Sequence, residues 1–184
     1  MTSKETSVIM EAIRLAYQKT AVITEADAKK TLALWSAMFA ETPYELVNNA
    51  VKSFIMTDTK GFPPTIGQIN ALITEAKMSG YPSADEAWAM VREAIGNGLY
   101  GSYEEFNALP DICKKVVASP QNLYDWANLD YEGLNVVRST FLKRYKEVIN
   151  QTEYLVSLPP TVAEKRAQLS GSIKMLAEKI GGSK

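Results

Sequence analysis

The clearest helix start in this chain is the stretch Phe62-Pro63-Pro64-Thr65-Ile66-Gly67-Gln68-Ile69. Two consecutive prolines favour extended backbone, so the chain is expected to approach the helix in an extended form. Thr65 is suited to the N-cap position, and Gln68 three residues later completes a capping box. Phe62 is expected to pack back against the helix that it precedes. The stretch therefore predicts a helix that begins at Ile66.

Helical spacing also extends through the residues before this stretch. Apolar side chains recur there at intervals of three or four residues, which is the pattern of one face of an α-helix. Thr24 is suited to cap the second of three predicted helices, and Pro43 to stand in the first turn of the third. The apolar positions are Ile9, Ile13 and Tyr17 in the first helix, Ala28, Leu32, Trp35 and Phe39 in the second, and Val47, Val51, Phe54 and Ile55 in the third.

The residues after this stretch predict a second group of helices. Gly80-Tyr81-Pro82 is the best candidate boundary, and capping boxes follow at Ser83 and Ser102, each with a glutamate three residues later. A long helix is predicted at 130–150. Two prolines again precede a threonine in the segment Leu158-Pro159-Pro160-Thr161.

These signals together predict the domain organisation. Alternating period-two stretches, which would indicate strands, do not occur. We expect an all-α fold with two small helical lobes, at residues 1–79 and 81–150. Residues 151–184 are expected to form a linker and a C-terminal amphipathic helix, which is the C-terminal arm.

The residue types that the chain lacks exclude several kinds of active site. The 184 residues include no histidine and a single cysteine, Cys113. The lack of histidine excludes Ser-His-Asp triads, Cys-His dyads and histidine metal ligands. One cysteine excludes intrachain disulfides and four-cysteine zinc sites, and Cys113 is expected to be a small buried side chain on a helix. We therefore expect no catalytic residue, no cofactor and no metal.

The sequence also predicts a cytoplasmic protein. No apolar run approaches the roughly 18 residues that a membrane span needs. The segment Met1-Thr2-Ser3-Lys4-Glu5 has no long apolar core behind it, as a secretory signal would have.

The charge distribution argues against a stand-alone nucleic-acid binder. The net charge is -1, with 0 in residues 1–80, -3 in residues 81–150 and +2 in residues 151–184. A protein that neutralises many phosphates by itself needs a strong positive excess. The basic side chains of the predicted long helix spread around it at about 100° per residue rather than forming one stripe. They are Arg138, Lys143, Arg144 and Lys146.

Two further patterns resemble catalytic motifs but have structural explanations. Residues 96–101 contain the glycine spacing of a dinucleotide-binding loop, yet they follow a predicted helix instead of a strand, so a helix-ending turn is expected. The acidic pairs Asp85-Glu86 and Glu104-Glu105 fall in the first turn of predicted helices, where carboxylates are favoured. An enzyme with carboxylate chemistry remains a third hypothesis without positive support.

Two groups of side chains are candidate partner-binding surfaces. Tyr100 and Tyr103 belong to a concentration of aromatic residues between positions 99 and 131. These aromatic residues suit the packing of a small helical subdomain, a protein interface or, less well because the surrounding charge is negative, the stacking of single-stranded bases. The second group is the apolar stripe of the C-terminal arm, which either docks on its own chain or enters a groove on another. It comprises Val162, Leu169, Ile173, Leu176 and Ile180.

The order of several aromatic and apolar residues resembles a known family. It runs through Tyr17, Trp35-x-x-x-Phe39, Tyr44-x-x-Val47-x-x-Ala50-Val51 and the Phe62–Ile69 stretch. This order resembles the N-terminal domain of phage replicative-helicase loaders and inhibitors, known from phages of Gram-positive bacteria, over roughly the first 75 residues. Residues 81–150 look like the second half of longer phage replication proteins.

The resemblance implies a protein without its own ATPase. It implies binding to the phage's DnaB-type hexameric helicase, inhibition of that ring until release, and delivery to an origin-bound initiator. Family members tend to use the N-terminal domain for the initiator and the C-terminal part for the helicase. In the family's short form the C-terminal part is flexible, whereas residues 81–150 here are too apolar and too well capped for a tail. A DNA-binding replication or transcription-regulating helical module is the alternative.

Overall fold

The computed structural model describes residues 1–20, 24–162, 164–166 and 168–169. All regular secondary structure within these ranges is α-helical, which confirms the predicted all-α class. The chain divides into two compact units. The first unit comprises Met1–Lys77 together with Leu155–Lys184, and the second comprises Met78–Tyr154.

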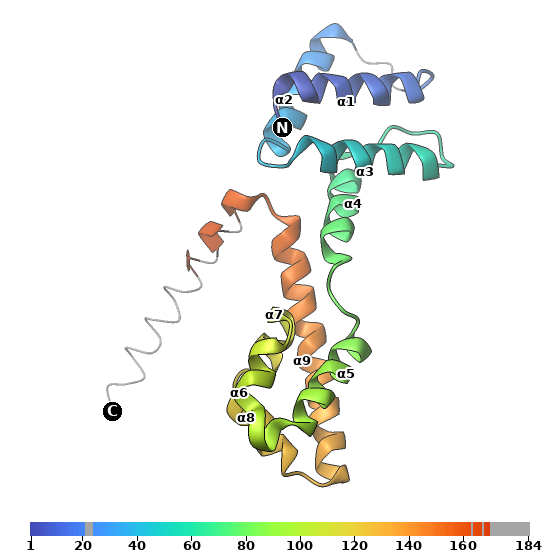
Figure 1. Ribbon diagram of the computed structural model, residues 1–184. Coiled ribbons are helices and arrows are strands. Elements are labelled where there is room, and N and C mark those ends of the chain that lie inside the picture. The colour runs from blue at the N-terminus through green and yellow to red at the C-terminus, as the bar shows by residue number, and fades with distance from the viewer. Residues whose placement is uncertain (21–23, 163, 167, 170–184) are drawn as a thin grey trace. The chain divides into compact units, whose positions relative to one another are not determined.

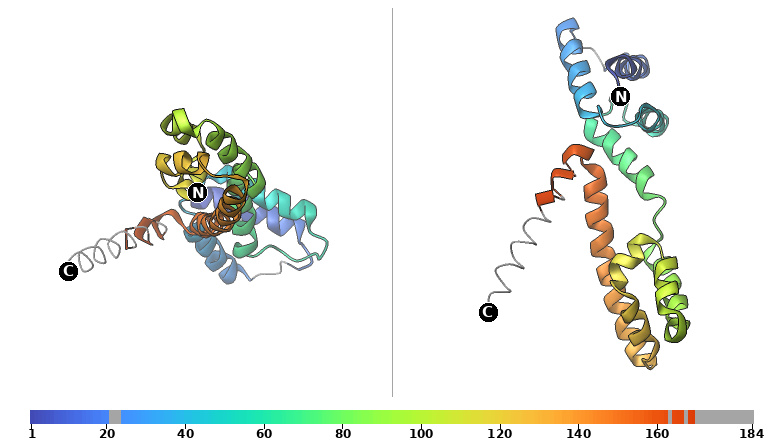
Figure 2. Two further views of the ribbon diagram at one scale, coloured as in Figure 1. Left: turned by 90° about the horizontal axis from the view of Figure 1, so that it is seen from below. Right: turned by 60° about the vertical axis from the view of Figure 1, so that its left-hand side comes forward.

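The first unit is built on four helices. They are α1 (Ser3–Ala16), α2 (Glu25–Met38), α3 (Tyr44–Thr57) and α4 (Ile66–Met78). α1 and α3 lie alongside each other and α2 crosses them (Figures 1 and 2). The core between them consists of Ile9, Ile13, Tyr17, Trp35, Phe39, Val47, Ala50, Val51, Ile69 and Ile73.

The predicted helix start at Ile66 is confirmed. The Thr65 hydroxyl accepts a hydrogen bond from the Gln68 amide nitrogen at 3.3 Å, and the Gln68 side chain accepts one from the Thr65 amide at 2.8 Å. Phe62, however, is 64% exposed, so the expectation that it packs on this helix was wrong. Gly61 adopts φ +73°, and the turn through this residue leaves the Phe62 ring in solvent.

The second and third helices begin close to where the sequence places them. Thr24 accepts a hydrogen bond from the Asp27 amide at 3.2 Å, which confirms it as a cap. Pro43 stands at the N-cap with ψ 137° instead of inside the first turn. The apolar face of α2 is only partly covered, because Trp35 and Phe39 are buried whereas Ala28 is exposed.

The second unit gathers short helices on one long helix. These are α5 (Ala84–Gly96), α6 (Gly98–Ala108), α7 (Asp111–Val117), α8 (Pro120–Ala127) and α9 (Tyr131–Ser157). Trp88 of α5 packs against Phe141 of α9 with ring centroids 5.5 Å apart, and the Phe141 ring stacks on Tyr145 at 5.8 Å. The Tyr145 hydroxyl donates a hydrogen bond of 2.5 Å to the Pro82 carbonyl oxygen, tying α9 to the residue before α5.

Two helix boundaries in this unit differ from prediction. α9 continues past position 150 to Ser157, where the approach of Pro159 disfavours further helix. α6 has non-helical backbone at Gly101, with φ −134° and ψ 29°, so two helical segments meet there. The second segment resumes at the predicted Ser102, whereas the first segment, which begins at Gly98, was not predicted. The Glu105 carboxylate accepts a hydrogen bond of 2.8 Å from the Asn97 side chain, which holds the turn between α5 and α6.

Candidate interaction surfaces

Tyr100 and Tyr103 project from α6 into solvent. Tyr100 is 100% exposed and Tyr103 is 66% exposed. The opposite side of α6 faces the core, since Gly98 is buried and Phe106 is partly buried against the core cluster. Large aromatic side chains in solvent are candidates for contact with a partner, because tyrosine is enriched where protein interfaces concentrate their binding energy.

The other aromatic residues between positions 99 and 131 form two groups, one packed against the core and one exposed. Phe106 and Trp126 pack against the core of the second unit, as expected for a small helical subdomain. Tyr124 on α8 and Tyr131 at the start of α9 stay exposed, with 43% and 78% of their surfaces in solvent. Burial thus distinguishes the aromatic side chains that pack in the core from the exposed ones that a partner can contact.

The predicted stripe of the C-terminal arm is only partly described. Val162 and Leu169 are 47% and 64% exposed, whereas Ile173, Leu176 and Ile180 lie outside the described residues. Upstream of the stripe, the Thr161 amide donates a hydrogen bond of 3.0 Å to the Glu41 carboxylate. The start of the arm is therefore held to the first unit, while its described apolar side chains remain in solvent.

A hollow between α1 and α2 escaped the sequence analysis. It has a volume of about 420 Å³ and is lined mainly by apolar side chains, with Pro63 and Pro64 on one side. Glu11 and Arg14 stand at its edge and are joined at 2.6 Å, and the hydrogen bond from Arg14 lowers the pKa of Glu11. No local pattern predicts this hollow, because it arises where Ala28 and Leu32 of α2 fail to close on α1.

Residues 1–70 of this unit also match a family of known proteins. The matching family model is that of the N-terminal domain of a phage helicase loader/inhibitor. Residues 1–70 are similar to a loader/inhibitor N-terminal domain. Comparisons with curated proteins and with solved structures give no match.

The core of the matched residues contains most of the side chains on which the resemblance rests. Tyr17, Trp35, Phe39 and Val47 are all buried, and the Trp35 and Phe39 rings lie 5.6 Å apart. Side chains of this kind specify the fold, because their contacts are with each other. The surfaces that meet a partner must be sought among exposed residues elsewhere.

Tyr17, within the matched residues, has an additional polar neighbour. Its hydroxyl is buried without a hydrogen bond of ordinary geometry, and it lies close enough to Asp58 for the two groups to interact electrostatically. Burial, and then the nearby Asp58 charge, raise the pKa of Tyr17. The amides of Lys60 and Gly61 donate to Asp58 at 3.1 and 2.9 Å and lower the pKa of this carboxyl group. These groups stabilise the turn after α3.

Cys113, Glu86 and Asp85, which were considered for catalysis, each have a structural contact or environment. Burial raises the pKa of the Cys113 thiol to about 11, which leaves it protonated and unreactive at neutral pH. Glu86 forms a capping box with Ser83, and Asp85 pairs with Arg138 at 3.3 Å. In the described part of the chain, no three histidine, cysteine or acidic side chains gather as a metal site would require.

The described helices also lack what a bilayer-spanning helix requires. None of those in the described ranges combines the length and the apolar character that a membrane span needs.

Proposed function

We propose that this protein is a phage DNA-replication adaptor that binds a DnaB-type hexameric replicative helicase. In this proposal it holds the helicase inactive and loads it at an origin through an initiator protein, in the cytoplasm of the bacterial host. It works by stoichiometric binding, without catalysis, cofactor or metal. The observation that carries the proposal is the match of residues 1–70 to the loader/inhibitor family.

The mechanism follows from differential affinity. A hexameric ring must open or distort before DNA can enter it. A protein that binds the open or distorted ring more tightly than the closed one shifts the equilibrium by the ratio of the two affinities. The same preferential binding inhibits the helicase for as long as the adaptor stays bound, so loading and inhibition are two consequences of one interaction.

The exposed side chains give this proposal its contact sites. We assign the helicase contact to Tyr100 and Tyr103 on α6 and to the stripe of the C-terminal arm, of which Val162 and Leu169 are exposed. The family resemblance supports an initiator contact on the N-terminal domain. There the hollow between α1 and α2 provides an apolar recess of about 420 Å³ on the matched residues.

The decisive experiment mixes the full chain with the helicase from the same phage, with and without ATP. Complex mass and DNA unwinding are then read on the same samples. We expect a stable complex with reduced unwinding, and recovery of unwinding when an origin-bound initiator is added. Unchanged helicase mass and unchanged unwinding at adaptor concentrations well above those of the ring would contradict the proposal.

A further inference from the structure

Three exposed tyrosines of the second unit, Tyr100, Tyr103 and Tyr124, lie on α6 and α8, two helices whose charged side chains are all acidic. Residues 97–108 and 119–133, which include α6 and α8, contain five carboxylates and no lysine or arginine. The carboxylates are Glu104, Glu105, Asp125, Asp130 and Glu132. We call the exposed residues Tyr100, Tyr103 and Glu104 of α6 and Tyr124 and Asp125 of α8 the acidic tyrosine surface.

The two helices that carry this surface are packed directly against each other. Gly98 at the start of α6 is buried, and a Cβ atom at this position would lie 2.8 Å from the Leu123 carbonyl oxygen of α8. Both helices also contact α5, and Leu123 is fully buried in the core of the second unit. The exposed side chains therefore stand on a fixed support, which reduces the entropy lost when a partner binds.

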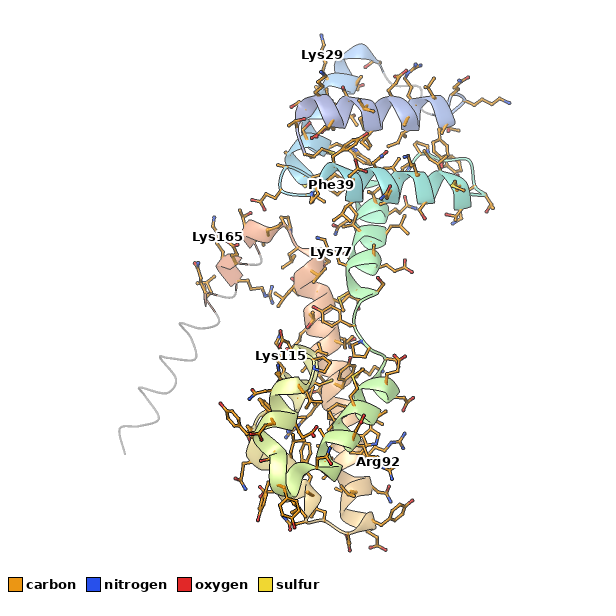
Figure 3. All side chains as sticks on the ribbon, in the orientation of Figure 1. Lys29, Phe39, Lys77, Arg92, Lys115 and Lys165 are labelled. Atoms are coloured by element: carbon orange, nitrogen blue, oxygen red, sulfur yellow. The ribbon has the colours of Figure 1, made fainter. Side chains whose placement is uncertain are left out.

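Basic side chains of the unit lie on neighbouring elements. Arg92 projects from α5 on the side away from α6 in Figure 3, and Lys115 lies on α7. Lys114 of α7 is paired with Asp111 at 3.4 Å, and Arg138 of α9 with Asp85 at 3.3 Å. The negative charge of α6 and α8 is thus not neutralised by an ion pair with any of these four residues.

We infer that the acidic tyrosine surface binds an arginine- and lysine-rich segment of a partner protein. The inference rests on the proposed function, because it specifies the chemistry of the partner at Tyr100 and Tyr103. Tyrosine faces attract guanidinium and ammonium groups by cation–π interaction, and carboxylates beside them pair with the same cations. Arginine is favoured over lysine, because its planar guanidinium group stacks on rings and binds carboxylates with two hydrogen bonds.

The same charge pattern disfavours nucleic acid at this surface. Exposed aromatic rings stack single-stranded bases in proteins that surround them with basic side chains, which neutralise the phosphates. Here the residues that follow Tyr103 and Tyr124 in the sequence are Glu104 and Asp125, whose carboxylates repel phosphates. A basic protein segment is therefore the occupant that both the rings and the charges favour.

The test uses the full chain and three probes of defined chemistry: nona-arginine, nona-lysine and a 20-nucleotide oligothymidylate. Binding is measured by fluorescence anisotropy at two salt concentrations. We expect nona-arginine to bind more tightly than nona-lysine, and oligothymidylate more weakly than either. The double variant Tyr100→Ser/Tyr103→Ser should weaken nona-arginine binding by about fivefold or more, since each cation–π contact contributes roughly 0.5–1 kcal/mol.

Four further variants distinguish the chemistry of the surface from effects on the fold. Tyr100→Phe/Tyr103→Phe retains both rings and should restore nona-arginine binding, whereas Glu104→Lys should weaken it. Met56→Ser and Glu75→Lys change an 86% exposed apolar side chain and an exposed carboxylate of the first unit. These two controls should leave binding unchanged. The inference is overturned if the control variants lose as much nona-arginine affinity as the surface variants do. It is also overturned if oligothymidylate binds this surface more tightly than nona-arginine does.

A parallel measurement of helicase complex formation distinguishes the two proposals. If the helicase binds the serine double variant and the wild-type chain equally, and nona-arginine does not distinguish them either, the inference fails and the proposed function stands. If the helicase never binds but nona-arginine binding depends on Tyr100, Tyr103 and Glu104, the proposed function fails and the inference about surface chemistry stands.

Discussion

Gly98 of α6 meets the backbone of Leu123 in α8 so closely that only a hydrogen atom fits between them. A Cβ atom at Gly98 would lie 2.8 Å from the Leu123 carbonyl oxygen and 3.3 Å from the Ala127 side chain. Because a carbonyl oxygen in a helix cannot move aside without breaking its own hydrogen bond, Gly98 sets the spacing of the two helices that carry the acidic tyrosine surface.

Gly98→Ala is therefore expected to destabilise the second unit by about 1–3 kcal/mol, the range for overpacking a well-packed site. Urea unfolding measures this change. Gly96→Ala is the matched control, because nothing lies within 4 Å of the corresponding Cβ position. It should leave stability unchanged or raise it, since alanine favours helix. Equal effects of the two substitutions would contradict the role assigned to Gly98.

Ala118, which follows α7, has a strained backbone. Its φ of 73° with ψ −37° lies in a region that side chains with a Cβ atom rarely adopt. Ala118→Gly should raise stability by about 0.5–1 kcal/mol, because the relief of strain exceeds the added entropy of the unfolded chain. Ala89→Gly, at an exposed position inside α5, should lower stability by about 1 kcal/mol. In thermal melts, the melting temperature should rise for Ala118→Gly and fall for Ala89→Gly, relative to wild type.

Tyr145→Phe removes the hydroxyl that donates to the Pro82 carbonyl oxygen at 2.5 Å. The side chain is 2% exposed, so the loss of this hydrogen bond should cost about 0.5–1.5 kcal/mol in urea unfolding. Tyr131→Phe makes the same chemical change at a 78% exposed position and is the control. A Tyr145→Phe chain as stable as wild type would show that water replaces the bond at no cost.

Acid should weaken the start of α5. Hydrogen bonds from the Ser83 side chain and backbone lower the pKa of Glu86. A carboxylate with a lower pKa in the folded state contributes stability that is present above its unfolded pKa and is lost as the pH falls through its folded pKa. Melting temperatures measured downward from about pH 5 should therefore fall less steeply for Glu86→Gln than for wild type. Glu93→Gln, elsewhere on α5, controls for the loss of one charge.

Leu169→Asp tests the C-terminal arm. Leu169 is 64% exposed, so the substitution should leave helical circular dichroism and melting of the chain nearly unchanged. It should abolish the complex with the helicase, because a charge placed in an apolar contact is not compensated. Complex formation that survives the substitution would remove the arm from the proposed interface.

The fold could be predicted from sequence to the extent that its signals are local. The reciprocal hydrogen bonds of Thr65 with Gln68 and of Ser83 with Glu86 involve residues three apart, and both helix starts were found. The first turn of α6, before Gly101, was missed, because Gly98 is required there by its close contact with Leu123, twenty-five residues away. Local pattern contains no information about that contact.

The candidate surfaces could be predicted only in part, for the same reason. The concentration of aromatic residues drew attention to Tyr100 and Tyr103, but only the packing of α6 separates them from Phe106, which lies against the core. The hollow between α1 and α2 depends on how two helices meet, so the spacing of Ala28 and Leu32 within one helix could not predict it.

The hydrogen bond between Tyr145 and Pro82 bears on whether the second unit can be transferred between proteins. It joins the entrance of the second unit to its last helix, across 63 residues of sequence. Segments whose ends are fastened together can be inserted into a host protein or excised from it with little disturbance to the flanking chain. The second unit is thus closed on itself between Pro82 and Tyr145, an arrangement that tolerates transfer between chains.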